Sequence, residues 1–357
     1  MIRPGGGQRA QVVGTGLIGG SIGMALRQRG WVVAGHDIEA TRAERALQLG
    51  ALDAVGYDSE ALVTFVATPL GAVVEVARAS LARGGVVTDV AGIKGPIVAG
   101  LPHANFVGGH PMAGSEQEGV EGADPDLFEG ATWVLTPAES TAAPAFAAVR
   151  AVVTALGANV VELPAARHDD LVAMVSHVPH LTAATLMNMA SDAATEHASL
   201  LRLAAGGFRD MTRIAAGHPG IWPDICVENR VGILAVIDQL ASALGEVRRV
   251  IAGEDRGALL ALLERAREAR VNLPAGAPPA DDTAEVRVPV PDRPGVVAEI
   301  TTLLGELGIN IFDLEIAHSA EGDRGVLVLV VDAATVEVVR SSLNSRHYRC
   351  SVRRLGQ

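Results

Sequence analysis

The chain has 357 residues, of which 49% are hydrophobic, so it is long enough to form more than one core. Its formal net charge of −12 argues against a nucleic-acid partner, and its two distant cysteines, Cys226 and Cys350, provide neither a disulfide framework nor a metal cluster. No apolar run approaches the roughly 20 residues of a membrane span, and no secretory leader is recognisable. We therefore expect a cytoplasmic protein that binds neither membrane nor nucleic acid.

Residues 9–165 alternate short apolar runs with Gly-rich turns and helical patterns, which is typical of a parallel α/β sheet. The predicted strands cover residues 10–13, 31–35, 62–67, 85–88, 105–107 and 132–135. This pattern predicts a Rossmann-like doubly wound domain over residues 1–166.

The turn after the first strand carries a Gly-x-Gly-x-x-Gly pattern, which reads Gly14-Thr15-Gly16-Leu17-Ile18-Gly19. Gly14 permits the tight turn, Gly16 lets the backbone approach a pyrophosphate, and Gly19 allows close packing of helix on strand. Because the pattern lies between an apolar strand and an amphipathic helix, it predicts a dinucleotide site at the helix N-terminus.

The second strand ends on Asp37, 23 residues after Gly14, where a carboxylate accepts hydrogen bonds from ribose hydroxyls. The same carboxylate would repel a 2′-phosphate, so NAD is favoured over NADP, although Arg42 nearby leaves NADP open. Two further strand ends, at Thr68-Pro69 and at Gly92 to Lys94, point to the same edge of the sheet. Lys94 is the only lysine of the chain. Either this position requires an ammonium group, or the single lysine simply reflects an arginine-rich composition.

His110 lies in a Gly- and Pro-rich stretch, residues 108–116, which predicts a loop at the carboxyl edge of the sheet. An alcohol that loses a hydride must also lose its proton, and a neutral imidazole with a pKa near 6.5 is suited to accept it. We therefore predict that His110 is the catalytic base.

Residues 167–270 change to long Ala/Leu-rich stretches with helical periodicity, which predicts an all-α substrate and dimerisation domain. Ser176, His177 and His180 surround a proline that predicts a kink. Arg213 is the candidate clamp for a substrate carboxylate, because a guanidinium binds a planar carboxylate in a bidentate manner. Trp222 is expected to wall the pocket or to belong to the core.

Residues 271–283 are rich in proline, small residues and acids, and are predicted to form a linker. The segment after it, residues 284–357, has the element order βαββαβ, which predicts a ferredoxin-like domain.

Five motifs, taken in order, resemble the prephenate dehydrogenase family. They are the Gly-rich fingerprint, Asp-Val-Ala-x-x-Lys, Gly-Gly-His-Pro-x-Ala-Gly, Ser-His-x-Pro-His and Gly-Gly-Phe-x-Asp-x-Thr-Arg-Ile-Ala. The resemblance implies NAD-dependent oxidative decarboxylation of prephenate, in which His110 takes the proton of the ring hydroxyl. It also implies that Arg213 binds a substrate carboxylate near His180 and Ser176. The remaining implied contacts are the pocket residues Gly206 and Trp222 and a supporting ion-pair network of Arg209 and Asp210.

Gly92 stands where the family usually has a serine that bridges substrate and cofactor. A water molecule, Thr68 or Ser115 could replace that hydroxyl, and the sequence does not choose between them. The position of Lys94 in this same loop favours a role for it in binding the substrate.

The C-terminal domain resembles an ACT domain through the segments 291–295 and 308–311. This resemblance implies regulation by an amino acid, which we expect to be tyrosine. The implied effector residues are Asp292, Gly295, Asn310 and Ile311, in a homodimer formed through the helical domain.

The sequence leaves three alternatives to a prephenate dehydrogenase. An arogenate dehydrogenase performs the same chemistry on an amine-bearing substrate, and Arg213 would serve either substrate. A β-hydroxyacid dehydrogenase would typically need a lysine on the helical domain, but no lysine follows Lys94. A non-catalytic regulatory protein that binds NAD or an amino acid fits Gly92, whereas His110 and Arg213 argue against it.

Overall fold

The computed structural model describes residues 7–114, 117, 119–196, 203–217, 219–272, 283–291, 293–318 and 324–354. The chain divides into two compact units. The first consists of Met1–Met187 with Ile214–Leu240, and the second of Asn188–Arg213 with Ala241–Gln357.

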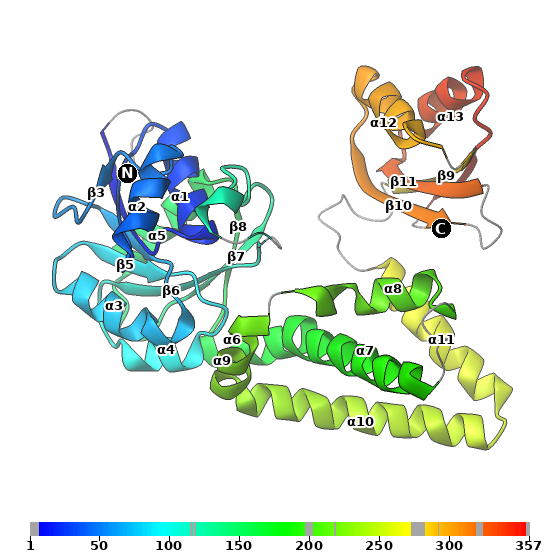
Figure 1. The fold of residues 1–357 in the computed structure, drawn as a ribbon, viewed down its shortest axis with the longest axis horizontal. Coiled ribbons are helices and arrows are strands. Elements are labelled where there is room, and N and C mark those ends of the chain that lie inside the picture. Colours follow the sequence, from blue (N-terminus) through cyan, green and yellow to red (C-terminus); the bar gives the residue numbers. More distant parts are fainter. Residues whose placement is uncertain are drawn as a thin grey trace. The chain divides into compact units, whose positions relative to one another are not determined.

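The first unit contains an eight-stranded sheet (Figure 1). In spatial order its strands are β3 (Ala54–Val55), β2 (Val32–His36), β1 (Arg9–Val13), β4 (Val63–Val66), β5 (Val86–Asp89), β6 (Phe106–Pro111), β7 (Thr132–Thr136) and β8 (Asn159–Glu162). Neighbouring strands are parallel except β6 and β7, which are antiparallel. All six predicted strands are confirmed. The edge strands β3 and β8 were not predicted, because β3 has two residues and β8 is mostly exposed, so neither shows a buried alternation.

Helices cover both faces of this sheet, which confirms the doubly wound architecture (Figure 1). On one face, α1 (Leu17–Gln28), α2 (Ala40–Gln48) and α5 (Ala143–Ala155) pack on residues such as Val12 and Phe65. On the other face, α3 (Val73–Leu81) and α4 (Gly95–Gly100) pack on Val66, Val87 and Phe106. Because the strand order reverses between β1 and β4, the carboxyl ends of these strands leave the crevice in which such sheets bind ligands.

The predicted helical segment begins with α6 (Ala165–Val172), a π-helical turn (Ala173–His177) and α7 (Val178–Glu196). Pro179, at which a kink was predicted, follows this π turn directly within one continuous helical run, so the helix departs from regular α geometry next to the proline. The helices that follow are α8 (Gly206–Thr212), α9 (Trp222–Glu228), α10 (Arg230–Ala252) and α11 (Arg256–Val271). In the first unit Ala173, Val178, Ile233 and Val236 form a small core.

The C-terminal segment has the predicted βαββαβ order. Its elements are β9 (Thr283–Pro291), α12 (Val296–Glu306), β10 (Ile311–His318), β11 (Arg324–Asp332), α13 (Val336–Ser345) and β12 (Ser351–Arg354). The strands form an antiparallel sheet in the order β10-β11-β9-β12, and its buried apolar residues pack with the two helices. Of the predicted linker, Val271 still belongs to α11, and residues 273–282 lie outside the described part of the chain.

Within the described residues, no helix combines the length and the apolar character that crossing a bilayer requires.

Candidate active site

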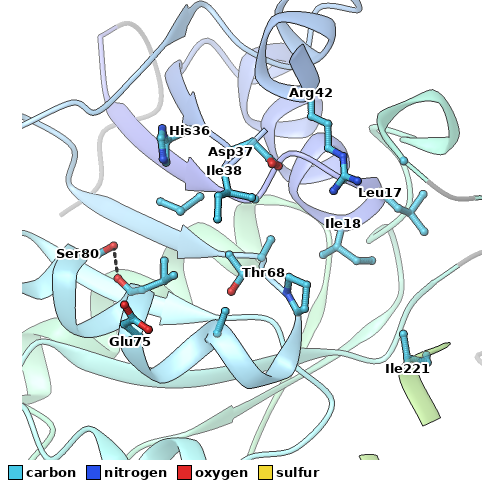
Figure 2. A pocket seen from close by; sticks show the side chains of 18 of the residues that line it. Leu17, Ile18, His36, Asp37, Ile38, Arg42, Thr68, Glu75, Ser80 and Ile221 are labelled. Carbon is cyan, nitrogen blue, oxygen red and sulfur yellow. Dashed lines mark hydrogen bonds between the residues drawn. The ribbon is translucent and has the colours of Figure 1, made fainter. Parts of the chain in front are cut away.

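A cavity of about 840 Å³ lies at the carboxyl ends of β1, β2 and β4 (Figure 2). Several predicted site residues line it, namely Gly14, Gly16, Leu17, Ile18, Asp37, Thr68, Pro69, His180 and Trp222. His110, Gly92 and Ser176 are not part of this lining. The cavity therefore gathers most of the residues predicted for the cofactor, without Thr15, Gly19 and Gly92, together with two from the helical segment.

The three glycines of the fingerprint differ in what surrounds them. A Cβ atom on Gly14 would lie 2.3 Å from the carbonyl oxygen of Ala67, and Gly14 also has a φ of +93°. A Cβ on Gly19 would lie 1.9 Å from the carbonyl oxygen of Gly14, whereas a Cβ on Gly16 would meet nothing within 4 Å. Gly14 and Gly19 are therefore required by packing, and Gly16 faces open space at the N-terminus of α1.

Asp37 is held rigidly at the end of β2. Its Oδ2 accepts hydrogen bonds from the backbone N–H of Thr15 at 2.8 Å and from the Thr15 hydroxyl at 3.2 Å, and its Oδ1 accepts from the backbone N–H of Glu39 at 3.0 Å. A carboxylate has about four acceptor sites and three are used here, so Asp37 keeps capacity for one ribose hydroxyl. The adjacent Ile38 is 95% exposed and faces the cavity (Figure 2), which provides an apolar surface for a flat base.

The hydroxyl of Thr68 is buried and has no hydrogen-bond partner among the described residues, although Thr68 lines the cavity. A buried hydroxyl without a partner is unfavourable unless a ligand or water completes it. Together with the open space at Gly16 and the carboxylate of Asp37, this hydroxyl shows that the crevice fits a dinucleotide.

His110 lies within β6 and pairs with Val134 of β7, so the predicted loop begins later than expected. The preceding glycines let β6 lie close to its neighbours, because a Cβ on Gly109 would lie 2.6 Å from the carbonyl oxygen of Asp89. Placement on a paired strand fixes the direction of the imidazole more firmly than a loop would.

A chain of hydrogen bonds ties His110 to two residues that the sequence did not single out. Nδ1 of His110 lies 2.8 Å from Nε2 of His168, and Nδ1 of His168 lies 2.8 Å from Oδ1 of Asp169. The carboxylate can only accept, so His168 donates through Nδ1 and, when neutral, accepts at Nε2 from Nδ1–H of His110. Nε2 of His110 is then left without a proton, as a base requires.

Burial lowers the pKa of His110 well below the usual 6.5, and the neighbouring His168, Lys94 and His177 lower it further. A lowered pKa means that His110 is neutral near pH 7 and available to accept a proton.

Lys94 is completely buried, and its ammonium donates to the carboxylate of Asp89 and, at 2.8 Å, to the carbonyl oxygen of Gly109. Burial lowers the pKa of Lys94, and the carboxylate of Asp89 opposes that change. The prediction that Lys94 contacts the substrate is not supported, because its side chain has no exposed surface in this structure. Lys94 instead joins the end of β5 to β6 beside His110.

Asp169 also organises the start of α4. Its two carboxylate oxygens accept from the backbone N–H groups of Lys94 at 2.8 Å and Gly95 at 2.7 Å. The same side chain therefore orients His168 and holds the loop that contains Lys94.

Gly92 lies beside His110, since a Cβ on it would be 3.7 Å from Nε2 of His110. This is ordinary contact distance, so a Cβ atom is sterically allowed at this position. Ser115, one of the candidate replacements, lies outside the described residues, and Thr68 keeps an available hydroxyl.

The predicted histidines of the helical segment surround Trp222. The His180 ring stacks on Trp222 with centroids 3.6 Å apart, and His177 contacts Trp222 edge-on at 6.2 Å. Asn229, which the sequence did not single out, donates to Nδ1 of His177 at 3.2 Å and to the carbonyl oxygen of Asp169 at 2.8 Å. Burial lowers the pKa of His177 to about 4 and also lowers that of His180, so both are neutral near pH 7.

The remaining predicted substrate residues, Gly206, Arg209, Asp210 and Arg213, are exposed and belong to the second unit. Within the described residues, Arg209 and Asp210 form no ion pair. Ser176 is half-buried in the π turn. The substrate contacts predicted for these five residues remain predictions.

In the ACT-like segment, Gly295 has a φ of +88° and precedes α12, Asn310 is exposed, and Ile311 begins β10. Asp292 lies outside the described residues.

No group of three or more potential metal ligands occurs in the part of the chain that the structure describes.

The arrangement matches known families along most of the chain. Residues 22–162 match the nucleotide-binding domain of prephenate dehydrogenase, residues 164–265 its dimerization domain, and residues 284–347 the ACT domain. Prephenate dehydrogenase of Bacillus subtilis is 35% identical over 335 residues, which cover 88% of this chain and 90% of that protein.

Two solved structures resemble the same region. Prephenate dehydrogenase of Aquifex aeolicus in complex with hydroxyphenyl propionate and NAD+ is 30% identical with a TM-score of 0.70, and covers 74% of this chain and 97% of its own. Arogenate dehydrogenase of Synechocystis is 29% identical with a TM-score of 0.65, and covers 74% and 99%. The chain described here therefore belongs to the prephenate dehydrogenase family, with an ACT domain after the dehydrogenase.

Proposed function

We propose that the chain catalyses the NAD-dependent oxidative decarboxylation of prephenate to 4-hydroxyphenylpyruvate, on the route to tyrosine. The observation that carries this proposal is the chain from Asp169 through His168 to His110, which leaves a neutral imidazole nitrogen free to act as base. The family match and the fit of the crevice to a dinucleotide support the same reading.

The cofactor is NAD, and bound NAD supplies the acceptor for hydride at its nicotinamide ring. Gly14, Gly16 and Asp37 would hold its pyrophosphate and adenosine ribose, and Thr68 lines the same crevice. Asp37 favours NAD over NADP, since its carboxylate would repel a 2′-phosphate.

His110 accepts the proton of the ring hydroxyl as hydride leaves the carbon that bears this hydroxyl. The ring carboxylate departs as carbon dioxide, and the electrons of the broken bond restore the aromatic ring. Return of the proton from His110 to the phenolate oxygen then gives 4-hydroxyphenylpyruvate. Aromatisation drives the step, so the work of the protein is to orient the hydroxyl and to accept its proton. We assign Arg213 to a substrate carboxylate and His180, with Ser176, to the surrounding pocket.

Arogenate is the second candidate substrate, because arogenate dehydrogenase of Synechocystis is similar over the same region. Formation of NADH, followed by its near-ultraviolet absorbance with purified protein, distinguishes the two. We expect turnover of prephenate to exceed that of arogenate. Turnover of arogenate alone would keep the mechanism and change the substrate, and inactivity with both would favour a regulatory, non-catalytic protein.

We further propose that the chain forms a homodimer through its helical segment. Helix α10 leaves large apolar side chains exposed at helical spacing, including Val231, Leu234, Ile237, Leu244 and Ile251. Exposed apolar surface of this kind is typical of an interface. Light scattering during size-exclusion chromatography should give the mass of two chains.

A further inference from the structure

A single arginine lies where the two cavities around the Gly-rich loop meet. Arg42, in the first turn of α2, lines the cofactor cavity and also a second cavity of about 520 Å³, which it shares with Gly16, Thr41 and Arg45. Figure 2 shows its guanidinium between the carboxylate of Asp37 and Leu17, at the start of α1. The side chain thus reaches toward the N-terminus of the helix that follows the Gly-rich loop.

The guanidinium of Arg42 forms only an exposed ion pair within the protein. Its ion pair is with Glu39 at 3.0 Å, and the two side chains are 60% and 55% exposed. Exposed ion pairs between neighbouring helical residues contribute little to stability, so this pair can yield to a stronger anion. Arg42 lies in the first turn of α2, where the helix dipole is positive and disfavours a cation. Stabilisation of the helix therefore does not explain an arginine at this position.

The cofactor cavity otherwise offers little positive charge. Among its described lining residues the other guanidinium belongs to Arg83, which is occupied over the ring of Tyr57 at 3.9 Å. The cavity also contains the acids Asp37 and Glu75, in a chain of net charge −12. A pyrophosphate carries two negative charges, and the partial charge of one helix N-terminus compensates only part of them.

We propose that Arg42 is a cofactor-binding residue that contacts the pyrophosphate of NAD. Its guanidinium closes the open space beside Gly16 and exchanges its pair with Glu39 for charge-assisted hydrogen bonds to phosphate oxygens. This inference rests on NAD binding and is independent of whether prephenate or arogenate is oxidised.

Isothermal titration calorimetry without substrate tests the proposal, using NAD, NADP, ADP and adenosine as ligands of the full-length protein. Arg42→Met keeps the aliphatic stem and removes the charge. This substitution should lower the affinity for NAD and for ADP about tenfold or more, as expected for loss of a charged hydrogen bond. The affinity for adenosine should not change. Arg42→Lys should restore part of the affinity for ADP.

Arg45→Met is the matched control. Arg45 lines the second cavity but not the cofactor cavity, and it pairs with Glu121 at 3.0 Å. Its substitution should change the affinity for ADP by no more than about twofold, as is usual for an exposed surface residue. Thermal melting of each variant confirms that it is folded.

Three results would overturn the assignment. Undiminished binding of ADP by folded Arg42→Met would remove Arg42 from the phosphate site. An equal loss of affinity for adenosine would show that Arg42 contacts the nucleoside of the cofactor and not its phosphates. A loss confined to NADP would assign it to a 2′-phosphate. Because ADP lacks the nicotinamide, all three outcomes are separate from a failure of the proposed dehydrogenase activity.

Discussion

At the scale of single residues, the position of Asp169 decides which nitrogen of His110 carries a proton. Asp169→Asn replaces one carboxylate oxygen by an N–H donor, which can reverse the direction of the hydrogen bonds through His168 and would also face the backbone N–H of Lys94 or Gly95. Nε2 of His110 would then hold the proton and could not act as base. We expect kcat to fall about 10²-fold or more, in the range of general acid–base contributions.

Asp170→Asn is the control for this variant, since Asp170 lies next to Asp169 on α6 and is exposed. It should keep the wild-type kcat. Equal losses in the two variants would show a general effect of charge near α6 and would contradict the assigned role.

The lowered pKa of His110 also fixes the direction of the pH dependence. Protonation removes the base, and the cationic form is disfavoured by burial, so kcat/KM should remain level near neutral pH. It should fall only in acid, through a pKa below 6.5. In Asp169→Asn this acid limb should move to lower pH, because a carboxylate no longer favours a proton on the histidine pair. A purely structural defect would lower the rate without moving the limb.

At the scale of elements, the close packing of β6 against β5 positions His110. Gly109→Ala would place a Cβ 2.6 Å from the carbonyl oxygen of Asp89 and 2.8 Å from the hydroxyl of Thr88. Because the backbone of Asp89 can move away only at the expense of its strand pairing, we expect the free energy of unfolding to fall by about 1–3 kcal/mol. We also expect kcat to fall. Urea-induced unfolding and steady-state kinetics measure the two effects.

Gly114→Ala provides the comparison, because a Cβ there would meet nothing within 4 Å. It should change neither stability nor kcat. If Gly109→Ala also left both unchanged, β6 would have more freedom than its contacts indicate.

At the scale of the whole molecule, the ACT domain leads us to propose feedback by tyrosine. An effector acts only if its affinity differs between two states of the protein, and such coupling usually changes affinity about 5- to 150-fold. Tyrosine should therefore raise the KM for prephenate or lower kcat, and prephenate should weaken tyrosine binding where the coupling is on affinity. Phenylalanine, tryptophan and alanine serve as comparisons. Absence of any effect from all four amino acids would refute regulation through this domain.

The sequence by itself determined the features that depend on neighbouring residues. Hydrophobic periodicity predicted the six inner strands and the βαββαβ segment, because alternation and helical spacing are local properties. The Gly14-to-Gly19 pattern and Asp37 located the dinucleotide crevice, since a tight turn and the end of a strand are also local. His110 was predicted as the base because its motif was expected at the same edge of the sheet, and that role remains a prediction.

Only the tertiary structure decided which residues act on His110. His168 is 58 residues away along the chain, and a histidine beside an aspartate on a polar helix gives no signal of its own. The sequence also marked Lys94 as unusual without showing that it is buried between Asp89 and Gly109. Contacts of this kind depend on how separate elements pack, and packing is set by the fold as a whole rather than by local pattern.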